Sequence, residues 1–208
     1  MKKDSIQLKI DKYYTDKINT YGSSHLGVDW NSNDSQELRF KILSQVLNEK
    51  NNFTILDYGC GYGALIPFLE QNFNFSYTGF DISKEMLKNA EENYKKLENI
   101  TFTNNLENIS NVNYSIASGI FNVKLDISEN EWENYIFETL EKINKVSNNG
   151  FSFNMLSNYS DKEFMKDYLY YADPLKIFDY CKKRFSKNVA LLHDYNLYEF
   201  SIIVRKNE

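Results

Sequence analysis

From residue 53 to residue 205, short apolar segments alternate with longer segments whose apolar residues recur at helical spacing. Strands that alternate with helices are joined by right-handed crossovers, so they lie parallel in one sheet. We therefore predict an α/β fold with a Rossmann-like, doubly wound sheet. The pattern places strands at 53–58, 76–80, 100–103, 114–121 and 151–156, and helices at 64–72, 84–97, 129–146 and 174–185.

Both ends of the chain depart from this alternation. Two further strands are predicted at 188–193 and 198–205, and the short turn between them indicates a hairpin, so the last strand is antiparallel. Gly150 is expected to end the helix at 129–146, and Asp173-Pro174 to begin the next helix.

The first fifty residues predict a short helix at 13–18, a turn-rich segment at 22–33 and an amphipathic helix that begins at Ser35. A length of 208 residues suits one domain with a single core. We expect that domain, 1–208, to consist of an N-terminal helical cap (1–50) on a Rossmann-like core (51–208).

Charge and cysteine content exclude several classes of function. The formal net charge is -5 and no long basic run occurs, so we expect no nucleic-acid partner. Cys60 and Cys181 belong to no paired motif, so we expect neither a disulfide framework nor a bound metal. Because the sequence shows no apolar leader and no uncharged stretch of bilayer length, we expect a cytoplasmic protein without membrane insertion. No pattern indicates an oligomeric state.

A glycine-rich turn follows the first predicted strand. In a doubly wound sheet, ligands bind beyond the carboxyl ends of the strands, and this turn lies there. Gly59, Gly61 and Gly63 allow a sharp bend and a close approach of backbone to ligand. Asp81 ends the second strand, where a carboxylate can accept both hydroxyls of a ribose. A tight turn without a ligand is the competing interpretation of the glycines alone.

From Phe53 onward the chain resembles the class I methyltransferases, which use S-adenosylmethionine. The resemblance rests on Asp57-Tyr58-Gly59-Cys60-Gly61, on Asp81 and on the final hairpin. It implies that Gly59 and Gly61 line the methionine part of the cofactor and that Asp81 binds the ribose. It further implies that Ile82 and Met86 flank the adenine, that Asn104 bonds the adenine amine, and that Arg39 pairs with the cofactor carboxylate. Turn formation by Asn104 and an exposed position for Arg39 are the alternatives.

A nicotinamide or flavin dinucleotide is the alternative cofactor. Gly59, Gly61 and Ala64 also fit the G-x-G-x-x-G/A pattern of dinucleotide-binding turns. Asp57 argues against it, because a buried carboxylate would repel the pyrophosphate at this turn. The ammonium and sulfonium of S-adenosylmethionine are instead favoured by a carboxylate.

Three residues are candidates for work on the methyl acceptor. Asn122 lies in Ser118–Val123, which resembles the strand-four motif of the family, and would orient the acceptor. The hairpin turn would bring His193 to the cleft as a base, with Asp194 orienting the imidazole. Tyr171, in the long loop after strand five, would belong to an aromatic lid. Structural roles are the alternatives: a turn that leads to a helix for Asn122, a buried histidine for His193 and core packing for Tyr171.

Several stretches resemble a small bacterial subfamily found with surface-polysaccharide and flagellin-glycan genes. This resemblance implies a small polar acceptor, such as a sugar or amino-acid amine or hydroxyl, and an N-methyl amino-acid substituent of a flagellin glycan is one version. An oxidoreductase dependent on NAD(P) or FAD, or a non-catalytic cofactor-binding protein, remains the alternative. The stretches are Gly27–Trp30, Gln36–Phe40, Ser118–Val123, Tyr170–Pro174 and His193–Tyr195.

Overall fold

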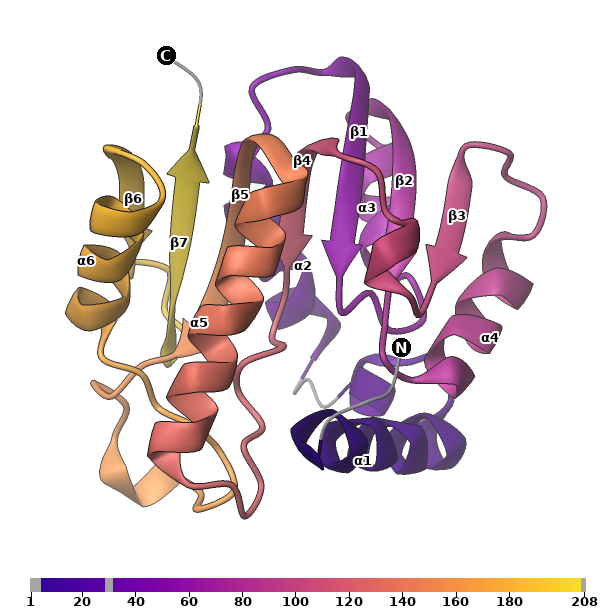
Figure 1. The fold of residues 1–208 in the computed structure, drawn as a ribbon. Coiled ribbons are helices and arrows are strands. Elements are labelled where there is room, and N and C mark those ends of the chain that lie inside the picture. Colours follow the sequence, from indigo (N-terminus) through magenta and orange to yellow (C-terminus); the bar gives the residue numbers. More distant parts are fainter. Residues whose placement is uncertain (1–4, 29–31, 207–208) are drawn as a thin grey trace.

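The computed structural model describes residues 5–28 and 32–206. Asp29 and Trp30, which belong to the stretch Gly27–Trp30 named in the sequence analysis, lie outside the described residues. Its seven-stranded sheet has the order β3-β2-β1-β4-β5-β7-β6 (Figure 1). The strands are β1 (Asn51–Tyr58), β2 (Asn74–Phe80), β3 (Ile100–Thr103), β4 (Val112–Ala117), β5 (Ser147–Leu156), β6 (Asn188–Leu192) and β7 (Glu199–Arg205). The helices are α1 (Ser5–Tyr21), α2 (Asn33–Leu43), α3 (Leu65–Glu70), α4 (Lys84–Tyr94), α5 (Glu129–Val146) and α6 (Pro174–Arg184), with short 3-10 turns between some elements.

The strand pairing confirms the predicted fold class. β1 pairs in parallel with β2 and β4, β2 with β3, and β4 with β5. β7 is antiparallel to both of its neighbours, β5 and β6. The sheet is therefore Rossmann-like and mostly parallel, and the carboxyl ends of β1, β2 and β4 meet at one edge.

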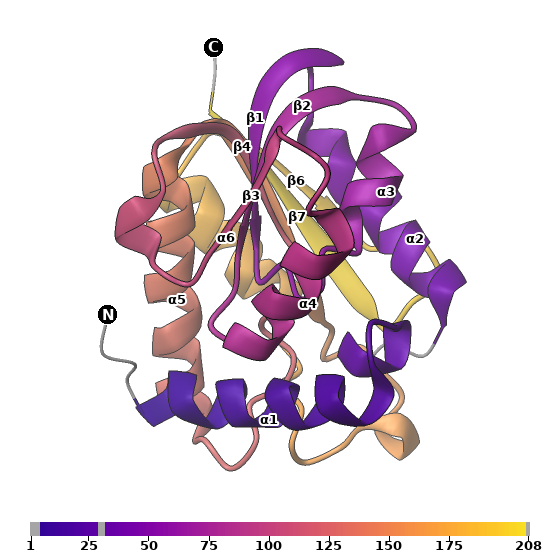
Figure 2. The same ribbon diagram turned by 90° about the vertical axis from the view of Figure 1, so that its right-hand side faces the viewer.

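Helices cover both faces of the sheet, α5 and α6 on one side and α2 and α3 on the other (Figure 2). On the α5 side, Trp132 is fully buried and its indole Nε1 donates to the carbonyl of Phe121 at 2.9 Å. On the α3 side, Phe53 and Tyr114 pack edge to face, with ring centroids 5.7 Å apart. Burial of this apolar surface on both faces stabilises the sheet.

Helix α1 lies across the carboxyl ends of the strands instead of on a face (Figure 1). The hydroxyls of Thr15 and Ser83 are 2.9 Å apart, and Lys9 forms an exposed ion pair with Asp126 at 2.7 Å. These contacts attach α1 to the segments that follow β2 and β4. The short helix predicted at 13–18 is thus one part of a 17-residue helix. Helix α2, by contrast, packs against β5 and β7.

Two expectations about the central segments were wrong. Gly150 does not end α5, which stops at Val146, but lies in β5 opposite Arg205. A Cβ at this position would stand 2.4 Å from the carbonyl oxygen of Val204, so close strand packing requires the glycine. Strand β4 ends at Ala117 instead of Phe121, because Gly119 turns the chain with a φ of 75°.

No helix within the described residues is long and apolar enough to cross a membrane.

Candidate active site

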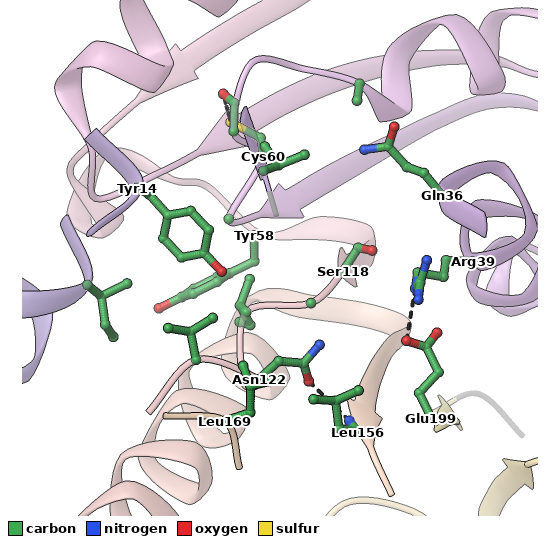
Figure 3. Close-up of a pocket in the computed structure, with 18 of the residues that line it drawn as sticks. Tyr14, Gln36, Arg39, Tyr58, Cys60, Ser118, Asn122, Leu156, Leu169 and Glu199 are labelled. Carbon is green, nitrogen blue, oxygen red and sulfur yellow. Dashed lines mark hydrogen bonds and ion pairs between the residues drawn. The ribbon is translucent and has the colours of Figure 1, made fainter. Parts of the chain in front are cut away.

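A cavity of about 650 Å³ lies at the carboxyl edge of the sheet, between the strand ends and α1. Figure 3 shows its walls, with Tyr14 of α1 on one side and the Arg39–Glu199 pair on the other. Residues from the glycine turn, from the end of β2 and from the loop after β4 all line it. The cavity therefore occupies the position at which a doubly wound sheet binds ligands.

The glycine turn forms one wall of the cavity. Gly59 has a φ of 82°, and its N–H donates to the carbonyl of Phe80 at 2.7 Å, which draws the turn against the end of β2. A Cβ on Gly59 would lie 2.3 Å from Cγ2 of Ile120, so only glycine fits. Gly61, with a φ of 54°, borders the cavity and leaves its backbone open to close approach.

Asp81 is anchored at the end of β2 by two backbone amides. Its Oδ2 accepts from the N–H of Gly61 at 2.9 Å, and its Oδ1 accepts from the N–H of Ser83 at 2.8 Å. Each carboxylate oxygen has more than one lone-pair direction, so it can accept a further hydrogen bond from a ligand. Ile82 and Met86 line the cavity beside it. The arrangement fits a sugar with vicinal hydroxyls and an attached planar ring.

Asp57 is buried at the end of β1 and also lines the cavity. Burial raises the pKa of its carboxyl to about 7, the hydrogen bond from Tyr77 opposes the rise, and the charge of Asp81 adds to it. The carboxyl therefore gains and loses its proton near neutral pH. A cation bound nearby would favour the ionised form.

Two of the three acceptor candidates line the cavity. Asn122 is buried, and its Oδ1 accepts from the N–H of Leu156 at 3.1 Å, while Figure 3 shows its amide nitrogen directed into the cavity. Tyr171 lies farther along the wall, and its hydroxyl accepts from the N–H of Lys166 at 3.0 Å. Tyr168 shares that wall, whereas Tyr170 is buried and donates to Glu133.

His193 and Asn104 lie outside the cavity lining. His193 is exposed, and its ring packs 5.9 Å from that of Tyr159. The hairpin turn does reach the cavity, but through residues 196–199. Asn104 is exposed on the turn after β3. Its proposed bond to the adenine stays a prediction.

The cavity contains a buried ion pair that the sequence did not reveal. Nε of Arg39 donates to Oε2 of Glu199 at 2.8 Å, and both side chains line the cavity (Figure 3). Arg39 is 7% exposed, so it is not a surface charge of an amphipathic helix. Ser118 also borders the cavity, and its Oγ is buried. The sequence feature that could have indicated Glu199 is an acidic residue at the start of an apolar strand. Because this strand is antiparallel to the others, it begins at the edge of the sheet where the cavity lies.

Comparison with known proteins identifies the family. Residues 49–187 match the family model described as a methyltransferase domain. The chain is 48% identical over 163 residues to Rv1506c of Mycobacterium tuberculosis, a protein named as a methyltransferase. These residues are 78% of this chain and 98% of that protein.

Solved structures with the same fold cover nearly the whole chain. Magnesium protoporphyrin IX methyltransferase from Synechocystis, with bound S-adenosylhomocysteine, matches with a TM-score of 0.69 at 13% identity, over 98% of this chain and 100% of that one. A complex of DhpI with SAM and HEP matches with a TM-score of 0.66 at 12% identity, over 99% of this chain and 100% of that one. The chain therefore belongs to the methyltransferase family and has the fold of its class I members.

Proposed function

We propose that this protein transfers the methyl group of S-adenosylmethionine to a small polar acceptor, a sugar or amino-acid amine or hydroxyl. The observation that carries the cofactor half is the bond from Gly61 N–H to Asp81, which joins a ligand-accessible turn to an anchored carboxylate inside the cavity. Family membership supports the reaction. The two structural neighbours above were solved with S-adenosylhomocysteine and with SAM, respectively.

The residues of the cavity fit this cofactor. When bound, S-adenosylmethionine supplies an electrophilic methyl group on a sulfonium. The Asp81 carboxylate would accept the ribose hydroxyls, and the Ile82 and Met86 side chains would pack on the adenine. Gly59 and Gly61 would admit the methionine part, the Asp57 carboxyl would face its cationic groups, and Arg39 would bind its carboxylate; all four residues line the cavity.

The dinucleotide alternative is not favoured. Two carboxyl groups, those of Asp57 and Asp81, stand at the glycine turn, and each interacts unfavourably with the other's charge. A pyrophosphate would add two further negative charges there. A ligand with a net positive charge relieves this repulsion instead.

Positioning of the acceptor is the main task left to the protein, because methyl transfer is a single displacement. Asn122 is suited to it, since the bond from Leu156 N–H fixes the amide and leaves its nitrogen toward the cavity. Tyr171 would close the far wall over the acceptor. The finer version of the proposal is an N-methyl amino-acid substituent of a flagellin or surface glycan.

A labelled-donor assay tests the proposal. The purified chain is incubated with S-adenosylmethionine that carries a trideuterated methyl group, together with a panel of amino sugars, sugars and amino acids. We expect S-adenosylhomocysteine and one labelled product, and fragmentation of that product distinguishes a methylated amine from a methylated hydroxyl. A chain that binds the donor yet forms no S-adenosylhomocysteine with any acceptor would support the non-catalytic alternative.

A further inference from the structure

The ion pair between Arg39 and Glu199 joins residues 160 positions apart, from α2 and from the start of β7. Their side chains are 8% and 1% exposed. Burying two charges carries a large desolvation penalty, and a buried pair is often no more stabilising than apolar residues of the same size. Because this pair lines the ligand cavity, a role in binding explains it better than a contribution to stability.

Glu199 is held by Arg39, and Asn154 lies near its carboxyl. Burial raises the pKa of its carboxyl, while the charge and hydrogen bond of Arg39 oppose the rise. The amide of Asn154 opposes it too, although Nδ2 of Asn154 makes no well-formed hydrogen bond among the described residues. Oδ1 of Asn154 meanwhile accepts from Gly119 N–H at 2.8 Å, which ties Asn154 to the loop after β4. A fixed carboxylate of this kind can set the plane of the guanidinium it accepts from.

A guanidinium can serve two carboxylates at once, because its five N–H groups lie along more than one edge. The bond to Glu199 uses Nε of Arg39. A carboxylate bound in the cavity would meet the same guanidinium through its terminal nitrogens.

Ser118 gives a second, independent indication of a ligand. Ser118 lines the cavity, and its Oγ is buried and has no hydrogen-bond partner among the described residues. Figure 3 shows the hydroxyl on the side of the loop that faces Arg39. An unsatisfied buried hydroxyl carries a desolvation penalty, which a ligand oxygen between Ser118 and Arg39 would remove.

We propose that Glu199 is a positioning residue, which orients Arg39 so that the guanidinium and the Ser118 hydroxyl together bind the carboxylate of the methyl donor. This inference rests on the proposed function and adds Ser118 and Glu199 to the residues that recognise the donor. A purely structural ion pair between α2 and β7 is the competing explanation.

Two ligands separate these explanations: S-adenosylhomocysteine and its decarboxylated analogue, which keeps the adenosine, the sulfur and the ammonium. Binding of both ligands is measured by calorimetry with the wild type and with Ser118→Ala, which removes a hydroxyl that has no partner among the described residues. We expect Ser118→Ala to weaken S-adenosylhomocysteine binding by roughly 3- to 10-fold and to leave the affinity for the analogue unchanged.

Glu199 is tested by a pair of substitutions. Glu199→Met removes the acceptor at similar size and should weaken S-adenosylhomocysteine binding about 10-fold, again without effect on the analogue. Glu199→Gln still accepts from Nε of Arg39 and should restore most of that affinity. If Glu199→Met does not fold, Glu199→Ala takes its place in the same comparison with Glu199→Gln.

Three results would overturn the inference. The first is an equal loss of affinity for both ligands in Glu199→Met, and the second is an unchanged S-adenosylhomocysteine affinity in Ser118→Ala. The third is a Glu199→Gln variant that loses as much S-adenosylhomocysteine affinity as Glu199→Met. Failure of the wild-type chain to bind S-adenosylhomocysteine at all would instead contradict the proposed function itself.

Discussion

The phenolic hydroxyl of Tyr77 in β2 donates to Oδ2 of Asp57 in the neighbouring strand β1 at 2.7 Å, and both residues are buried. The bond favours the ionised carboxyl, but burial outweighs it and brings the pKa of Asp57 to about 7. The pair thus keeps a carboxyl that is only partly ionised at neutral pH beside the proposed cationic end of the cofactor. Such tuning makes charge at this position responsive to a ligand.

Asp57→Asn should stabilise the protein without ligand at pH 8. The pKa of Asp57 is raised on folding, so its contribution to stability is fully present below the unfolded pKa near 4 and is lost as pH rises through about 7. Replacing the ionised group by a neutral amide should therefore raise the free energy of unfolding at pH 8 by on the order of 2–4 kcal/mol. Urea denaturation at pH 8 and pH 5 measures this. A variant less stable than wild type at pH 8 would contradict the assigned pKa.

Cofactor affinity should rise with pH through about 7, because ionised Asp57 favours the ammonium and sulfonium of S-adenosylmethionine. Dissociation constants from pH 6 to pH 8 measure the effect, and Asp57→Asn is the control that should abolish the dependence while weakening binding at pH 8. A wild-type affinity that stays constant over this range would show that the carboxyl does not interact with the ligand.

Gly61→Ala should weaken cofactor binding by roughly 10-fold or more. The added Cβ would stand at the cavity wall, 3.0 Å from Cγ1 of Val28, and the φ of 54° strains any residue with a side chain. Gly22→Ala is a matched control, since Gly22 has a φ of 63° and open space around it. Both variants should lose similar stability, and only Gly61→Ala should lose affinity. Equal affinities would place the ligand away from this turn.

Asn122→Asp should lower kcat by roughly 10-fold or more with little change in donor affinity. Aspartate still accepts from Leu156 N–H, so the loop is kept, but the donor that faces the cavity is lost. His193→Ala, in an exposed side chain outside the lining, should leave kcat within about 2-fold of wild type. Steady-state rates on the acceptor found in the labelled-donor assay check both. A large loss in His193→Ala would restore the histidine as a catalytic candidate.

Local sequence patterns predicted most of the fold. Helix α5 begins and ends where the pattern placed it, because Ser128 caps it and apolar residues such as Trp132 and Ile136 recur at helical spacing. The third strand, at Ile100–Thr103, has the predicted bounds as well. Gly150 was misassigned because a glycine that ends a helix and one that admits a neighbouring strand look alike in sequence.

The candidate site was predictable where it depends on one turn and unpredictable where distant segments meet. Gly59, Gly61 and Asp81 follow directly from strand order and lie in the cavity. The pairing of Arg39 with Glu199 depends on how α2 packs against β7, which no short-range pattern encodes. Topology placed the final hairpin turn at the cavity, but it could not tell that Glu199 faces inward and His193 outward.

Calorimetric titration of the wild-type chain with S-adenosylhomocysteine, with NADH as the comparison ligand, measures which class of cofactor the cavity binds. We expect saturable binding of S-adenosylhomocysteine at one site per chain and no binding of NADH. Asp81→Asn, which leaves only one carbonyl oxygen for the bonds now received from Gly61 and Ser83, should reduce that affinity at least about 10-fold. Folded protein that binds NADH but not S-adenosylhomocysteine would contradict the assignment of S-adenosylmethionine as the cofactor.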